Sequence, residues 1–106
     1  MKKQRAVNEL KNINKPPPDF KLRLFITGAT PNSVRAITNI RNICESYLKD
    51  RYELQIIDVY QDSKLAQQEQ LIALPLLIKK HPLPERKLIG DLSETEKVLK
   101  ALGVDM

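Results

Sequence analysis

Residues able to do covalent, acid–base or metal chemistry are few in this sequence. Cys44 is its single cysteine and His81 its single histidine among 106 residues. One thiol excludes a disulfide framework and a cysteine-rich zinc site, and one imidazole argues against a histidine-based metal site. His81 stands beside prolines, so no Ser–His–acid set can be proposed for it. Gly28, Gly90 and Gly103 stand alone, so no glycine-rich loop is present to hold a phosphate. The sequence therefore predicts a protein that is not an enzyme and uses no cofactor.

The charge of the chain is unevenly distributed. Eighteen basic residues against thirteen acidic ones give a net charge of +5, and five of the basic residues lie within residues 1–20. The run Pro16–Pro18 stops any helix and favours an extended chain, so we expect a polar extension over 1–19 and one domain over 20–106. No aromatic side chain alternates with the basic ones of the extension, which argues against nucleic-acid binding.

The sequence also predicts the compartment. No segment approaches the roughly 20 continuous apolar residues of a membrane-spanning helix, and the first residues contain no apolar core of a signal peptide. A lone cysteine suits a reducing environment. We therefore expect a cytoplasmic protein that does not bind membranes.

Hydrophobic periodicity predicts alternating strands and helices. Short or alternating apolar runs indicate strands, and apolar residues three and four apart indicate helices. The predicted elements are strands over 20–27, 54–59, 76–78 and 86–89, a helix from Pro31 to about Leu48, a weaker helix over about 63–72, and a final helix starting at a capping box, Ser93-x-x-Glu96. The order βαβαββα describes an α/β fold in which a mixed sheet is packed by helices, as in thioredoxin-like proteins.

The first helix and the second strand carry the clearest patterns. Thr30 is placed to cap the first amides of the helix, with Asn32 and Ser33 as alternative caps, and Pro31 has the backbone angle of a first helical residue. Apolar residues at helical spacing predict the buried stripe of this helix: Val34, Ile37, Ile40, Cys44, Tyr47 and Leu48. The apolar run over 54–59 predicts a largely buried strand.

A thioredoxin-like order raises the question of thiol chemistry. Thioredoxin-like enzymes carry a cysteine pair at the turn between the first strand and the first helix, but here that turn, residues 28–32, contains no thiol. Cys44 lies more than two helical turns further on, among apolar residues, which predicts a buried and inert thiol. Leu74–Pro75 stands where such proteins often place a cis proline, and this agrees with the fold without identifying it.

Several blocks of the sequence resemble one known family. The segment Leu24-Phe25-Ile26-Thr27-Gly28-Ala29-Thr30-Pro31-Asn32-Ser33-Val34-Arg35-Ala36 is similar to the signature of the circadian clock protein family KaiB. Further blocks resemble this family in the same order and spacing, at residues 39–43, 52–59, 71–77 and 82–93. The resemblance covers about residues 20–104 and leaves the extension outside.

The resemblance implies a regulatory protein that binds the hexameric ATPase KaiC and modulates its phosphorylation or signalling. It also allows the chain to belong to the noncyanobacterial branch of the family, in which a KaiB-like protein and a paired KaiC homologue serve stress adaptation. A sensor kinase or another signalling protein is a further expected partner. Two alternatives stay open: a KaiB-fold stress adaptor that no longer binds KaiC, and a basic nucleic-acid binder.

Members of this family are known in two forms. One is a tetrameric ground form ordered βαββααβ, and the other is the thioredoxin-like form βαβαββα that binds KaiC. Leu74, Pro75, Ala101 and Gly103 are the candidate fold-switch residues, and Ala101 stands where glycine is common in the clock proteins. Because alanine favours helix over glycine by roughly 1 kcal/mol, we expect either the thioredoxin-like form, as a monomer or dimer, or a less stable tetramer.

The resemblance also implies docking residues, carried over one at a time. Arg35 matches a basic residue on the KaiC-facing surface, and Lys87, beside Arg86, matches another. Gln55 and Gln70 stand where clock members usually have lysine. We therefore expect a docking surface that includes these five residues and attracts an acidic ring less strongly than usual.

Overall fold

The computed structural model describes residues 17–69 and 73–104. Its elements, in chain order, are β1 (Phe20–Ile26), α2 (Pro31–Tyr47), β2 (Tyr52–Asp58), α3 (Ser63–Gln68), β3 (Leu76–His81), β4 (Arg86–Ile89) and α4 (Thr95–Leu102). This is the predicted order βαβαββα, and it confirms the thioredoxin-like α/β fold.

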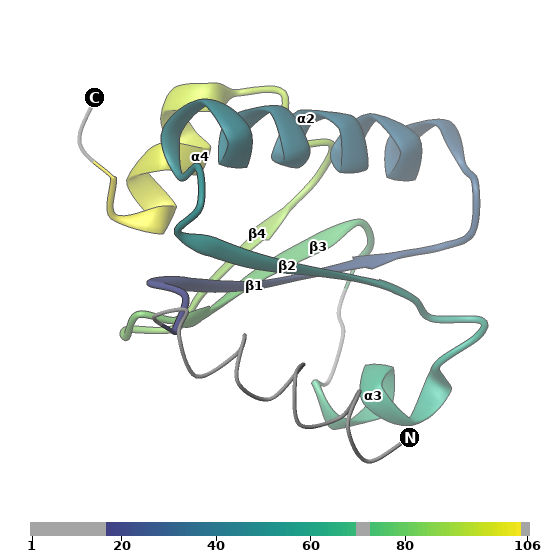
Figure 1. Cartoon of the computed structure of the whole chain (residues 1–106). Helices are drawn as coiled ribbons and strands as arrows, with labels where there is room; N and C mark the ends of the chain where they lie inside the picture. The colour runs from purple at the N-terminus through teal and green to yellow at the C-terminus, as the bar shows by residue number, and fades with distance from the viewer. Residues whose placement is uncertain (1–16, 70–72, 105–106) are drawn as a thin grey trace, which may run out of the picture.

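The four strands form one sheet in the order β2-β1-β3-β4. β1 is parallel to β2 and antiparallel to β3, and β3 is antiparallel to β4. Figure 1 shows α2 and α4 on one face of this sheet and the short α3 on the other. The two edge strands, β2 and β4, therefore lie on opposite sides of the β1–β3 pair.

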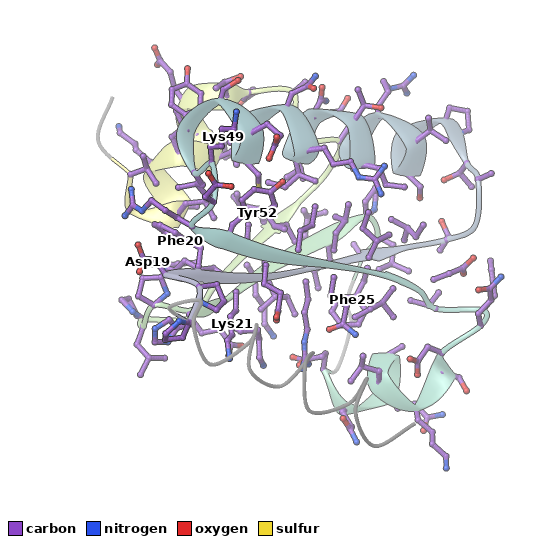
Figure 2. All side chains as sticks on the ribbon, viewed as in Figure 1. Asp19, Phe20, Lys21, Phe25, Lys49 and Tyr52 are labelled. Atoms are coloured by element: carbon purple, nitrogen blue, oxygen red, sulfur yellow. The ribbon has the colours of Figure 1, made fainter. Side chains whose placement is uncertain are left out.

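Side chains alternate between the two faces along every strand. On the face of α2 and α4, Leu22, Leu24 and Leu77 join the buried residues of both helices in the main core. On the face of α3, a smaller cluster contains Phe25, Ile57, Leu76 and Ile78. In Figure 2 Phe25 lies on the α3 side of the sheet, whereas Tyr52 lies on the side of α2.

The start of α2 confirms the predicted cap. Oγ1 of Thr30 accepts a hydrogen bond from the N–H of Ser33 at 3.3 Å, and Pro31 is the first helical residue. The buried residues of this helix are Ser33, Ala36, Ile40, Ile43 and Cys44.

Two residues of the predicted stripe of α2 are instead exposed. Val34 is 48% exposed and Tyr47 is 43% exposed. Val34 lies about a third of a turn away from the stripe centred on Ile40, because successive helical residues are rotated by roughly 100°. Tyr47 is the last residue of the helix. The stripe prediction was wrong at these two positions.

Three further predictions need correction. The predicted capping box at Ser93 is wrong, because α4 begins at Thr95 and its N-cap residue, Glu94, makes no side-chain cap. The N–H of Ser93, which the box would bond to Glu96, is instead donated to Oδ1 of Asp91 at 3.1 Å. The second strand is only partly buried, since β2 is an edge strand with Gln55 exposed. α3 ends at Gln68, and residues 70–72 of the predicted helix lie outside the described residues.

The two ends of the described domain are held by local contacts. Before β1, Oδ2 of Asp19 lies 2.8 Å from Nε of Arg51, whose guanidinium carbon is 5.6 Å from the centre of the Phe20 ring; Asp19 and Phe20 are labelled in Figure 2. After α4, Gly103 adopts a left-handed φ of 78° and its N–H is donated to the carbonyls of Leu99 and Lys100. Gly103 is therefore a helix C-cap.

The described residues also bear on membrane insertion. None of their helices combines the length and the apolar character that crossing a membrane requires.

Replacing Thr30 tests the cap of α2. We expect Thr30→Ala to lower the free energy of unfolding by about 1 kcal/mol, because the N–H of Ser33 loses its acceptor. Thr30→Ser keeps the acceptor and should unfold close to the wild type. Urea denaturation followed by circular dichroism measures both, and equal loss in the two variants would contradict the capping role.

Candidate protein-binding surface

The strand register places two candidate partner-binding residues in one row across the sheet. Gln55 of β2 pairs with Arg23 of β1. Arg23 pairs in turn with Ile78 of β3, and Ile78 pairs with Lys87 of β4. Paired residues point to the same face of a sheet, here the face that carries α3. In this Gln55–Lys87 row the two outer members are exposed and Ile78 is buried.

One carboxylate beside this row binds two cations of the sheet. Oε1 of Glu69, just after α3, accepts hydrogen bonds from Nη1 of Arg23 at 3.2 Å and from Nζ of Lys80 at 3.0 Å. Lys80 also lies 3.2 Å from Oε2 of Glu85, which precedes β4. The Glu69 side chain is 11% exposed. The network therefore connects the end of α3 to β1, β3 and the turn before β4.

The carboxylates affect the protonation of Lys80. Its hydrogen bond to Glu69 is the main cause that raises the pKa of Lys80, against the opposing effect of burial. A raised lysine pKa means that this network stabilises the folded state at neutral pH and loses that contribution only as the pH rises through the folded-state pKa of Lys80.

Sequence patterns did not identify this network. Alternation along β1 places Arg23 on the face opposite to Leu22 and Leu24, and a cation between apolar neighbours signals the need for an acid. The acid is Glu69, which is 46 residues away. Local spacing carries no information about a contact of that separation.

Arg35 lies on the other side of the sheet, on α2. Its Nη2 donates to Oδ1 of Asn32, and its Nε lies 3.7 Å from Oδ2 of Asp91. The Arg35 side chain nevertheless remains 57% exposed. Hydrogen bonds from Ser93 are the main cause that lowers the pKa of Asp91, and the charge of Arg35 adds to the effect. Arg35 thus links α2 to the loop after β4 and still presents its guanidinium to solvent.

Arg86 and Lys87 are neighbours on β4 and point to opposite faces. Arg86 pairs with Lys79 of β3 on the side of α4, where Arg86 is exposed and Lys79 is 5% exposed. Burial is the main cause that lowers the pKa of Lys79, and the charge of Arg86 adds to it.

The five candidate partner-binding residues are therefore not on one face. Gln55 and Lys87 share the Gln55–Lys87 row, Arg86 lies on the other face of the same edge strand as Lys87, and Arg35 lies on α2. Gln70 lies outside the described residues.

The candidate fold-switch residues lie at the entry to β3 and the end of α4. Leu74 and Pro75 are joined by a cis peptide bond, and the carbonyl of buried Pro75 accepts the N–H of Gly90 at 3.0 Å. Ala101 is half-buried within α4, and Gly103 caps that helix. A role of these four residues in conformational switching stays a prediction.

The turn between β1 and α2 carries hydroxyl groups instead of thiols. Oγ1 of Thr30 donates to Oγ of Ser33 at 2.8 Å, and this Oγ accepts the N–H of Thr27 at 3.2 Å. Cys44 is fully buried in the main core, and burial is the main cause that raises its pKa to about 12. Within the part of the chain that the structure describes, no three His, Cys, Asp or Glu side chains are placed to hold a metal.

Replacing Glu69 tests the charge network. We expect Glu69→Gln to lower the free energy of unfolding by about 1 kcal/mol, because two half-buried cations lose their carboxylate while solvent screens part of the loss. Glu53→Gln is the matched control, since Glu53 is exposed on β2 and makes no ion pair within residues 17–69 and 73–104. Equal urea midpoints for the two variants would contradict a stabilising role of Glu69.

Comparison with known proteins identifies the family of the chain. The family model of the KaiB domain matches residues 23–104. The circadian clock oscillator protein KaiB of Picosynechococcus sp. is 47% identical over 87 residues, which cover 82% of this chain and 82% of that protein. The protein of the same name from Synechococcus elongatus is 44% identical over 91 residues, covering 86% and 87%.

Solved structures similar to this chain share its fold. Mitochondrial thioredoxin 3 of Saccharomyces cerevisiae superposes with a TM-score of 0.66 at 15% identity, covering 92% of this chain and 88% of the thioredoxin. The N-terminal domain of Synechococcus elongatus SasA gives a TM-score of 0.66 at 23% identity, covering 83% and 86%. These likenesses show the thioredoxin-like fold, and the sequence matches show the ancestry: the chain belongs to the KaiB family.

Proposed function

We propose that this protein is a non-enzymatic clock-type regulator that docks on a KaiC-like hexameric ATPase and modulates its phosphorylation or signalling. The observation that carries the proposal is its membership of the KaiB family over residues 23–104, with relatives named circadian clock oscillator proteins. Docking through surface side chains agrees with the buried, weakly acidic thiol of Cys44 and with the exposed cations on α2 and β4.

The Gln55–Lys87 row is the proposed centre of the docking surface. Its two outer side chains are exposed at both edges of the sheet, so a partner lying across the α3 face reaches both. Arg23, between them, is paired with Glu69, which leaves Lys87 as the cation of this row that forms no ion pair among the described residues. Arg35 provides a second exposed cation on α2.

Binding to a KaiC hexamer tests the proposal. The immobilised protein is presented with KaiC of Synechococcus elongatus in ADP and in ATP, and association is followed by biolayer interferometry. We expect binding to the wild type and weaker binding to Arg35→Ala and to Lys87→Gln, about fivefold for each charge contact of about 1 kcal/mol. The proposal would be overturned if the protein associated, in either nucleotide, neither with this KaiC nor with a KaiC homologue from the organism that encodes this chain.

A gain of charge tests the row itself. We expect Gln55→Lys to bind KaiC about fivefold more tightly, because an ammonium group is added opposite an acidic surface. Gln61→Lys adds the same charge at an exposed position after β2 and outside the row, and it should bind as the wild type does. Equal gains in the two variants would mean that net charge alone causes the effect, and they would contradict a specific contact between this row and KaiC.

The thiol of Cys44 provides a test of the non-enzymatic assignment. We expect no reaction of the native protein with Ellman's reagent at pH 8, because a thiol with a pKa of about 12 is protonated and this one is buried. The reaction should become complete in urea. Ser46→Cys in a Cys44→Ala background places a thiol at an exposed position of α2 and should react at once; rapid reaction of native Cys44 would contradict the assignment.

A further inference from the structure

β4 forms one edge of the sheet, and no strand of the described residues pairs with its outer side. The strand order places it last, next to β3 alone, and Figure 1 shows it leading to the loop before α4. Among the described residues no hydrogen bond to the backbone of Lys87 or Ile89 comes from outside the sheet. An edge of this kind is a template for one more strand.

The pairing with β3 determines which backbone groups of β4 face outward. The N–H of Gly90 is donated to the carbonyl of Pro75 at 3.0 Å, in line with the register that pairs Leu88 with Leu77. Hydrogen-bonded pairs alternate with non-bonded pairs in an antiparallel ladder. Arg86 and Leu88 therefore direct their backbone groups toward β3, and those of Lys87 and Ile89 point away from the sheet.

The side chains of this edge carry positive charge on both faces. Lys87 and Ile89 lie on the α3 face, where Ile89 is 59% exposed. Arg86 is exposed on the opposite face. Neither Arg86 nor Lys87 forms an ion pair with a described residue. A strand added here meets one cation on each face and the apolar side chain of Ile89 at the last position of β4.

Charge distinguishes β4 from the other edge and from a second copy of itself. β2 carries Glu53 and Asp58 and no basic residue, so an acidic strand is repelled there. Two β4 edges brought together would concentrate four cations, and lysines on an edge strand oppose such self-pairing. The edge therefore favours an acidic strand from another protein.

We propose that β4 binds an extended acidic segment of a partner protein as an antiparallel fifth strand. The outward N–H and C=O groups of Lys87 and Ile89 supply the backbone bonds, and the side chains select the sequence. In the antiparallel register the segment has an apolar residue opposite Ile89, any residue opposite Leu88, and acidic residues opposite Lys87 and Arg86. This site shares Lys87 with the proposed docking surface, so binding of a peptide in the absence of KaiC tests it separately.

The probe is a ten-residue peptide whose four central residues are isoleucine, threonine, glutamate and glutamate, in this order. Alternating threonine and valine flank them, and the N-terminus is acetylated and the C-terminus amidated. Fluorescence anisotropy measures its affinity, and amide shifts in a nitrogen–proton NMR spectrum locate it. We expect saturable binding with the largest shifts at Lys87 and Ile89. Replacing both glutamates by glutamine should weaken binding by more than fivefold, because each glutamate loses its contact with a cation of β4.

Backbone pairing is tested with N-methylated peptides. Two versions are methylated at alternate amides, so that one blocks the amides facing β4 and the other blocks those facing solvent. We expect the version blocked at the amides facing β4 to lose binding and the other version to keep it, because successive amides of a strand point in opposite directions. Equal binding of both versions would overturn strand addition.

Variants of the protein test the charges. We expect the double change Arg86→Gln and Lys87→Gln to weaken peptide binding by more than fivefold and to flatten its dependence on salt. The matched control, Lys97→Gln with Lys100→Gln, removes the same charge from exposed positions of α4 and should bind as the wild type does. Equal loss in both, largest shifts on β2, or no saturable binding would overturn the proposal, whatever the outcome with KaiC.

Discussion

The pairing of β1 with both of its neighbours is the constraint on which the rest of the structure depends. β1 is the strand that joins the parallel and antiparallel parts of the sheet. Its buried residues Leu22 and Leu24 face α2 and α4, while Phe25 faces α3. A shift of one residue in this register would move every side chain of β1 to the opposite face. The register therefore determines both cores and the composition of each row.

The α3 face is held by a small apolar cluster together with charge. α3 has six residues and none of them is buried, so the helix contributes little apolar area; Leu65 packs on the cluster around Phe25. Glu69 at its end binds Arg23 and Lys80. Removing one partner of a poorly hydrated ion pair costs more than the pair contributes, because a charge is left without compensation. The position of α3 therefore depends on Glu69 more than its exposed surface suggests.

The sequence predicted the order of elements because that order follows from local patterns. The alternation along β1 and the cap at Thr30 are both set by residues within a few positions of each other, and the structure confirms them. The capping box at Ser93 failed because Asp91, two residues earlier, competes for the same N–H. Strand order and register join residues far apart in the chain. The edge position of β2 and the bond from Arg23 to Glu69 were for that reason not predicted.

The candidate site likewise combines residues that the sequence identified with an arrangement that only the structure shows. Lys87 and Gln55 were identified by family resemblance, yet their common face follows only from the register of four strands. The turn after β1 differs in chemistry from the same turn of thioredoxin-like enzymes. Where thioredoxin-like enzymes carry reactive thiols, Thr30 and Ser33 use their hydroxyl groups to satisfy the first amides of α2 and the end of β1. Hydroxyl groups bonded in this way stabilise the turn, so the specificity of the proposed docking depends on the charges of the sheet and its edges.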